Sequence, residues 1–295
     1  MGNVFRFSIL FCFLGCVLLP VSSAVADAEI TARKDGGRKI NLSGRQRMLT
    51  QFMSKATCFA AASLDVERHK NSIASTHWLF ETTLRGLRHG DKIQGMLPET
   101  HEAVLAKLSE VEELWAKLGP AVTAARDSGF KDGKALDVVY EFNTPTLKSM
   151  NEAVSVIEKT YGDGAVDAEI AAALNVSGRQ RMLTQKASKE FCYIVSGTDV
   201  EANRGNLKKT VALFNQSLAA LINGKSEINI PKPPVGEIFD QLSIVQKLWQ
   251  PLNSVFQKVA DGATPTAEET RIILDGNEPV LKAMNRAVSL YEGIL

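Results

Sequence analysis

An eleven-residue polar block occurs twice in the chain, and this repeat constrains the fold more than any other feature. The first copy begins at Asn41 and reads NLSGRQRMLTQ; the second begins at Asn175 and reads NVSGRQRMLTQ. The copies, here called the repeated block (residues 41–51 and 175–185), differ at one position and start 134 residues apart. The same offset relates further residues, among them Cys58/Cys192, Trp115/Trp249, Asn143/Asn277, Pro145/Pro279, Met150/Met284 and Asn151/Asn285. One structural unit is therefore duplicated in tandem.

The first 26 residues have the pattern of a secretory signal peptide. Arg6 supplies a short positive start, an apolar stretch too short to span a bilayer follows, and Ala24-Val25-Ala26 is a small-residue cleavage site. We expect a mature chain that begins near Asp27 in an oxidising, periplasmic compartment. Acylation of Cys16, as in a lipoprotein, is the second interpretation.

The charge balance excludes some classes of partner. Removal of Arg6 takes the 34 basic residues to 33, against 33 acidic residues, so the mature chain has no net charge. Binding to nucleic acid or to an anionic membrane is therefore not expected. The mature chain retains two cysteines, Cys58 and Cys192, at equivalent positions of the repeat. We expect two buried thiols, with a disulfide between the copies as the alternative.

Helical periodicity runs through both copies. Apolar residues recur at spacings of three and four, as in the series Val104, Leu105, Leu108, Val111 and Leu114, and strand patterns are absent. Local signals predict four helices per copy. They are N-caps at Asp65 and Asp199, helix ends at Gly90 and Gly224, a kink or break at Gly119-Pro120, and a capping box that starts at Thr266. The sequence predicts an all-α protein of two antiparallel four-helix bundles, residues 39–161 and 168–295 with a linker at 162–167, packed as an intramolecular pseudo-dimer.

The repeated block suggests an anion-binding site. On a helix, Gly44 and Arg47 lie on one face, as do Gly178 and Arg181. Glycine gives a ligand access to the backbone, and arginine presents a planar charged fork that suits an oxyanion. Arg45 points to another surface. An adjoining stripe supplies possible supporting residues: Met48, Gln51 and Lys55, with Met182, Gln185 and Lys189 in the second copy.

Other chemistry has little support in the sequence. The four histidines, at 69, 77, 89 and 101, all lie in the first copy, so we expect surface histidines and no metal site. No haem-attachment motif, catalytic triad or phosphate loop is present, which predicts no cofactor and no enzymatic activity. Glu158 and Glu292 recur but have no evident partner. A structural role for the arginines, as partners of carboxylates within the fold, is the alternative to ligand binding.

The repeated block also resembles a known family of sensors. The string NLSGRQRMLTQ is similar to the N-terminal domain of PilJ-type chemotaxis transducers, and its Asn-x-x-Gly-x-x-Arg-Met core resembles the nitrate and nitrite sensor domains of NarX and NarQ kinases. The series Asn143, Pro145, Leu147, Met150 and Asn151 agrees with the fourth helix of that family. The resemblance implies a four-helix sensor bundle in which Gly44, Arg47, Gly178 and Arg181 bind one nitrate between two first helices.

The resemblance implies a sensory or accessory binding protein for a small oxyanion, with nitrate or nitrite favoured. The chain departs from the sensors because it carries the bundle twice and shows no flanking membrane helices or kinase region, so we expect it to report to a membrane-bound transducer or sensor kinase. A homodimer in which halves of different chains pair uses the same surfaces. The competing class is a helical adaptor whose repeated block docks a membrane transducer or a pilus component.

Overall fold

The computed structural model describes residues 21–162 and 164–294, with side chains from residue 32 onward. In this part of the chain the elements are helical, and the only β-type pairings are two isolated bridges at Asp91–Met96 and Lys225–Ile230. The helices are α1 (Val21–Ala61), α2 (Val66–His89), α3 (Glu102–Asp127), α4 (Gly133–Gly162), α5 (Ala168–Val195), α6 (Val200–Asn223), the short 3-10 helix η1 (Ser226–Ile228), α7 (Gly236–Ala260) and α8 (Ala267–Gly293).

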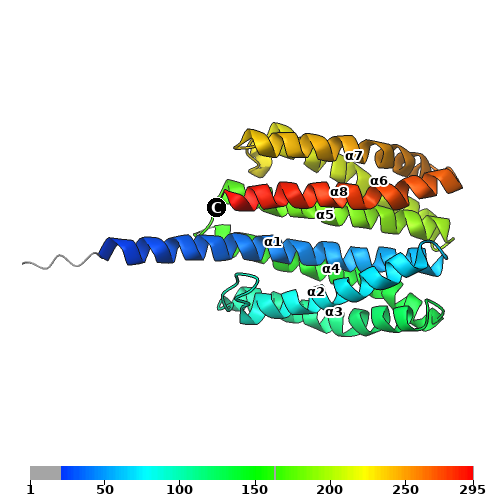
Figure 1. The fold of residues 1–295 in the computed structure, drawn as a ribbon, viewed down its shortest axis with the longest axis horizontal. Helices are drawn as coiled ribbons and strands as arrows, with labels where there is room; N and C mark the ends of the chain where they lie inside the picture. The colour runs from blue at the N-terminus through cyan, green and yellow to red at the C-terminus, as the bar shows by residue number, and fades with distance from the viewer. Residues whose placement is uncertain (1–20, 163, 295) are drawn as a thin grey trace, which may run out of the picture.

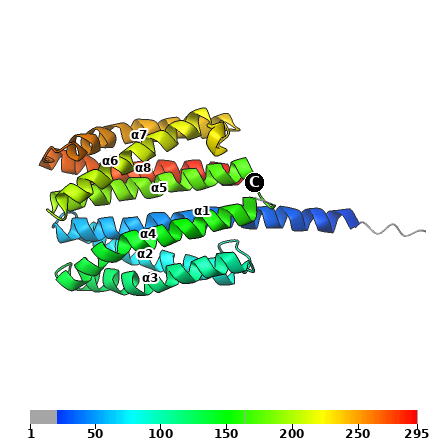
Figure 2. The same ribbon diagram turned by 180° about the vertical axis from the view of Figure 1, so that it is seen from behind.

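The helices pack as two halves that face each other through α1 and α5. In Figure 1, α2 and α3 lie on the outer side of α1 and α4, whereas α6 and α7 lie on the outer side of α5 and α8. Figure 2 shows the same order from behind, with α1 and α4 next to α5 in the middle. The predicted all-α architecture of two tandem bundles packed as a pseudo-dimer is confirmed. We call the contact between α1 and α5 the seam.

Helix ends follow the sequence signals in part. Gly90 and Gly224 end α2 and α6 with φ of 78° and 77°, a backbone conformation that favours glycine. Thr266 forms the predicted capping box with Glu269 at the start of α8. A break of the helix at Gly119-Pro120 is wrong, because α3 continues through Pro120 to Asp127.

Asp65 and Asp199 occupy the N-cap positions of α2 and α6, but neither side chain caps its helix. Both residues have left-handed backbones, and their carboxylates instead bind the opposite half. Asp65 accepts a hydrogen bond from Arg271 Nη1 at 3.1 Å, and Asp199 accepts one from Tyr140 Oη at 2.6 Å. These contacts tie the two halves together at the end of the molecule where α1 and α5 finish.

Part of the repeated block is structural. The amide of Gln46 donates to the carbonyl of Phe80 at 2.8 Å, and Gln180 donates to the carbonyl of Phe214 at 3.1 Å. Each phenylalanine is buried against a tryptophan of the third helix of its half, as the pairs Phe80–Trp115 and Phe214–Trp249. The repeated glutamines therefore hold the first helix of each half to the second, a role that needs no ligand.

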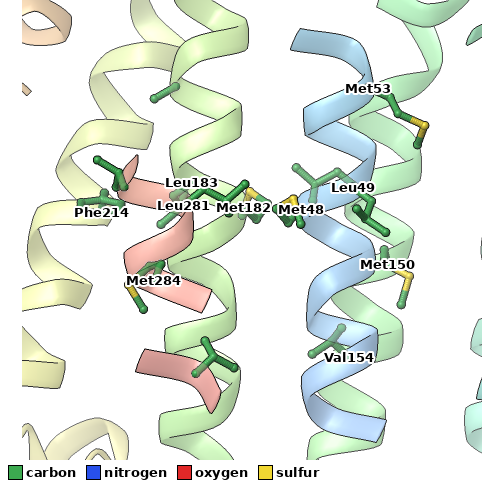
Figure 3. Close-up of a cluster of buried hydrophobic side chains, with 14 of the residues drawn as sticks. Met48, Leu49, Met53, Met150, Val154, Met182, Leu183, Phe214, Leu281 and Met284 are labelled. Atoms are coloured by element: carbon green, nitrogen blue, oxygen red, sulfur yellow. The ribbon is translucent and has the colours of Figure 1, made fainter. Parts of the chain in front are cut away.

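The seam is closed by apolar contact and by a covalent bond. Figure 3 shows the side chains of Met48 and Met182 directed at each other between α1 and α5. One end of the seam carries a disulfide between Cys58 and Cys192, whose Cα atoms are 6.2 Å apart. The expectation of two buried thiols is wrong, and the alternative of a bond between the copies is confirmed. Equivalent residues meet because α1 and α5 run side by side in the same direction.

One histidine is buried, contrary to the expectation of surface histidines. His69 is 5% exposed, its ring stacks on Phe59 with 5.8 Å between centroids, and its Nε2 has no hydrogen-bond partner among the described residues. Burial, followed by the positive charges of Lys55 and Arg68, lowers the pKa of His69 to about 4. The ring is therefore neutral at physiological pH.

The predicted signal peptide is largely outside the described residues, since the structure describes nothing before Val21 and only the helical backbone of residues 21–31. Within residues 21–162 and 164–294, none of the helices combines the length and apolar character that a bilayer crossing requires.

The disulfide is expected to contribute strongly to stability, because it joins residues 134 apart in the chain. The double variant Cys58→Ser/Cys192→Ser should lose on the order of 5 kcal/mol of unfolding free energy, as loop-closure entropy predicts. Urea unfolding of the variant and of reduced and oxidised wild type measures this loss. Equal stability of the oxidised and reduced protein would contradict the bond.

His69 should make the protein sensitive to mild acid. Its pKa is lower in the folded state than the ordinary value of 6.5, so between pH 6.5 and about 4 the unfolded chain binds more protons and stability falls as pH falls. The loss can reach about 3 kcal/mol. The variant His69→Asn introduces the residue that the second copy has at this position. Its free energy of unfolding, measured with urea, should depend less on pH over this range than that of the wild type. His89→Asn, at an exposed histidine, should retain the wild-type slope, and an unchanged slope in His69→Asn would contradict the assignment.

Candidate anion-binding site

The two glycines of the repeated block face each other across the seam. A methyl group placed on Gly44 would lie 3.9 Å from the Cα of Gly178, and one on Gly178 would lie equally close to the Cα of Gly44. The same methyl on Gly44 would lie 3.3 Å from Nη2 of Arg47 and 3.6 Å from Nη2 of Arg181. The structure therefore brings all four predicted ligand-binding residues to one place.

Each guanidinium reaches over to the opposite half. Arg47 Nη2 donates to the carbonyl of Asn175 at 3.1 Å, and its Nη1 donates to Oδ1 of Asn151 on α4 at 3.2 Å. Arg181 Nη2 donates to the carbonyl and to Oδ1 of Asn41, at 3.1 and 2.9 Å. Nε of each arginine is buried and has no partner among the described residues. Both guanidinium groups thus retain capacity to donate.

Positive charge in this site is poorly balanced. Arg47 and Arg181 are each 3% exposed, and among the described residues neither has a carboxylate oxygen within ion-pair distance. Burial lowers the pKa of Arg47 to about 9, with further contributions from Arg179 and Arg181, and burial also lowers the pKa of Arg181 to about 9. Both remain charged at neutral pH. Two buried like charges in a low dielectric repel each other strongly, and a bound anion would relieve that repulsion.

Two glutamates, for which sequence analysis identified no partner, supply negative charge close to the arginines. Glu292 accepts a hydrogen bond from Nδ2 of Asn41 at 2.6 Å, and Glu158 accepts one from Nδ2 of Asn175. Burial raises the pKa of Glu158. Each asparagine therefore bridges an arginine and a glutamate of the opposite half: Asn41 bonds Arg181 and Glu292, and Asn175 bonds Arg47 and Glu158. Sequence reasoning missed this role, although the recurrence of Glu158 and Glu292 at the repeat spacing was a signal that could have indicated it.

The predicted supporting residues form a separate layer of the seam. Lys55 Nζ donates to Oε1 of Gln185 and to Oδ1 of Asn277, both at 2.7 Å. Lys189 Nζ makes the equivalent bonds to Gln51, at 2.9 Å, and to Asn143, at 2.7 Å. The lysines and glutamines are thus occupied with each other across the seam. Met48 and Met182 are buried and point toward each other across the seam, where they provide apolar contact (Figure 3).

Burial lowers the pKa of Lys55 to about 7 and that of Lys189 to about 8. The seam therefore holds four buried basic residues, two of them fully charged at neutral pH. Within residues 21–162 and 164–294, no three side chains of the His, Cys, Asp or Glu type are grouped as a metal site would require. The chemistry available in the seam is donation of hydrogen bonds to an anion.

Alanine at the glycine contact tests the close approach of the two helices. Alanine for glycine inside a helix ordinarily stabilises by about 0.5–1 kcal/mol, and Gly205→Ala on α6, which meets no atom within 4 Å, should show this gain. Gly44→Ala/Gly178→Ala should show no gain, because each methyl displaces an arginine Nη2. Urea unfolding measures both variants. A gain per site equal to that of Gly205→Ala would contradict the packing.

Comparison with known proteins identifies the family of the repeated domain. The family model described as "Type IV pili methyl-accepting chemotaxis transducer N-term", PilJ, matches residues 31–136 and 168–272. A methyl-accepting chemotaxis protein of Pseudomonas aeruginosa, McpN, is 30% identical over 118 residues, which are 40% of this chain and 21% of the relative. The chain thus spans about a fifth of that relative's length. The two matched segments each contain one copy of the repeated block, and the chain belongs to the PilJ family, with two copies of its helical domain in tandem.

Proposed function

We propose that the protein is a periplasmic, non-enzymatic binding protein for a small oxyanion, nitrate or nitrite first, which it binds between Arg47 and Arg181. The observation that carries the proposal is the pair of buried guanidinium groups that meet beside the Gly44–Gly178 contact without a carboxylate at ion-pair distance. A planar anion with several acceptor oxygens can accept hydrogen bonds from the unpaired N–H groups of both guanidinium groups. A chloride or sulfate ion matches the planar arrangement less well.

The family gives the proposal its biological setting. The PilJ domain is named for chemotaxis transducers, and the relative in Pseudomonas aeruginosa is a methyl-accepting chemotaxis protein. We expect this chain to report anion occupancy to a membrane-bound transducer or sensor kinase. The disulfide between the halves supports an oxidising compartment, in agreement with a signal peptide over residues 1–26.

Anion binding would have a direct effect on the contact between the halves. The site draws one arginine and one asparagine carbonyl from each half, so its charge balance depends on how α1 and α5 are placed. An anion that neutralises both arginines would favour the closest approach of the two helices. A ligand shifts a conformational equilibrium only through such a difference in affinity. This supplies a route from occupancy to a change that a partner can recognise.

Selective stabilisation by nitrate tests the proposal. The mature chain is unfolded thermally at constant ionic strength with nitrate, nitrite, chloride or sulfate, and heats of binding are measured by calorimetry. An anion at 100 times its dissociation constant should stabilise the protein by about 2.7 kcal/mol. Arg47→Gln and Arg181→Gln should each abolish the response, because each removes half of the site.

Arg45→Gln is the matched control, because Arg45 belongs to the same block but its Nη2 binds Thr83 and Gln94 on the outer side of α1. It should keep the wild-type response. A response to nitrate no larger than that to chloride, or one that survives Arg47→Gln, would contradict the proposal.

A helical adaptor is the second candidate, and the buried position of the repeated block argues against docking through it. Ten of the eleven residues 41–51 are buried, all but Arg45. A partner could not reach these side chains without separating the halves. Recovery of a membrane partner by the wild type but not by Arg47→Gln, without any response to anions, would favour the adaptor.

A further inference from the structure

A cavity beside the seam is larger than the proposed oxyanion site needs. Its volume is ≈ 470 Å³, within the range of roughly 300–1,000 Å³ that is usual for small-molecule pockets, and it lies between α4, α5 and α6. Its basic lining consists of Arg47, Arg179, Lys186 and Lys209, and its apolar lining includes Leu147, Leu183 and Leu213. A three-oxygen anion would fill only a small part of this space.

Arg179 distinguishes this side of the molecule from its repeat equivalent. Its counterpart Arg45 donates through Nη2 to Thr83 and to Gln94, each at 3.0 Å. The residue equivalent to Gln94 in the second copy is Ile228, which offers no side-chain acceptor. Arg179 has no hydrogen bond or ion pair with any described residue, and its Nε is buried without a partner. Arg45 is therefore held by side chains of its own half, whereas Arg179, at the equivalent position, is free to bind a ligand.

The two lysines of the cavity also have no basic equivalent in the first copy. Lys209 is exposed on α6, and its equivalent in the first copy is Ser75. Lys186, whose equivalent is Phe52, is neutralised by Glu190 and also bonds Thr210. Glu158 offsets Arg179 and Arg47 at longer range, but its carboxylate is bound to Asn175 and does not line the cavity. Besides Arg47, which the oxyanion site also uses, Arg179 and Lys209 are therefore the cations that a ligand in the cavity would meet.

We propose that this cavity is a second binding site, for a small organic anion whose carboxylate faces Arg179 and Lys209 and whose apolar body lies against Leu147, Leu183 and Leu213. An inorganic anion would leave the apolar lining uncovered, above all Leu213, which is 39% exposed, and a neutral apolar ligand would leave Arg179 unpaired. A lining that is basic on one side and apolar on the other therefore favours a ligand that has both a carboxylate and an apolar body. The site goes beyond the proposed oxyanion site and does not require it, although Arg47 lines both.

Organic anions with neutral isosteres test the site. The mature chain is titrated calorimetrically with benzoate and hexanoate, with benzamide and hexanol as neutral controls, at constant ionic strength. The acids should bind and the neutral compounds should bind at least tenfold more weakly, because the neutral compounds lose the charge-assisted hydrogen bond to Arg179. Arg179→Gln should weaken benzoate binding about tenfold, and Lys209→Gln, at an exposed lysine, about two- to fivefold.

Two variants of equal charge change serve as controls. Arg45→Gln alters the repeat equivalent of Arg179, and Lys208→Gln alters the neighbour of Lys209, whose Nζ binds Asp261 away from the cavity. Both should bind benzoate like the wild type. Arg179→Lys, which keeps the charge, should retain part of the affinity for benzoate. Its binding would show that the lower affinity of Arg179→Gln does not result from unfolding.

The proposal is overturned if neither acid binds at tens of millimolar, or if Arg179→Gln binds benzoate as tightly as Arg45→Gln does. Nitrate titrations of the same variants separate the two sites. If the wild type binds nitrate but no organic acid, only the second site is wrong; if it binds benzoate through Arg179 but no nitrate, only the oxyanion site is wrong. A nitrate response that Arg179→Gln removes, without binding of either acid, would make the cavity an entry path and also overturns the proposal.

Discussion

Two buried guanidinium groups meet across the seam between the halves, and the rest of the proposed site is arranged around them. Removing one charge from water is costly, and two like charges add repulsion to that cost. The fold compensates with carbonyl oxygens of Asn41 and Asn175 and, one step further out, with Glu292 and Glu158. Every one of these links crosses from one half to the other. The arginines therefore depend on the seam, and the closeness of the seam depends on what balances the arginines.

The arginines and the seam depend on each other strongly because both halves belong to one chain and are joined by a disulfide. A duplicated unit places both arginines in one molecule, so the proposed site needs no association of separate chains. The disulfide at Cys58–Cys192 holds one end of the seam, and the contacts of Asp65 with Arg271 and of Asp199 with Tyr140 hold the same end. The glycine contact lies further back along α1 and α5. Changes in occupancy there would act on helices that are fixed at one end, which directs any movement toward the other.

Much of the architecture could be predicted from the sequence because a duplication repeats its signals. Helix ends depend on local contacts, so the roles of Gly90, Gly224 and Thr266 could be predicted from the sequence. The face shared by Gly44 and Arg47 could be predicted as well, from helix geometry. What escaped prediction depends on tertiary contact. The N-cap aspartates bind the opposite half, Pro120 is accommodated inside a packed helix, and His69 is buried although its repeat equivalent is an asparagine. The disulfide and the partners of the recurring glutamates required knowledge of which helices meet, and spacing alone left both open.

Stoichiometry tests the central claim most directly, because one shared site and two independent sites give different integers. Calorimetric titration of the mature chain with nitrate, combined with sedimentation to count chains per particle, measures nitrate bound per chain. If the arginines of both halves form a single site, the ratio is one for a monomeric particle, and it falls to zero when either arginine is replaced. A ratio of two per chain, or a ratio of one that survives loss of a single arginine, would contradict a site shared between the halves.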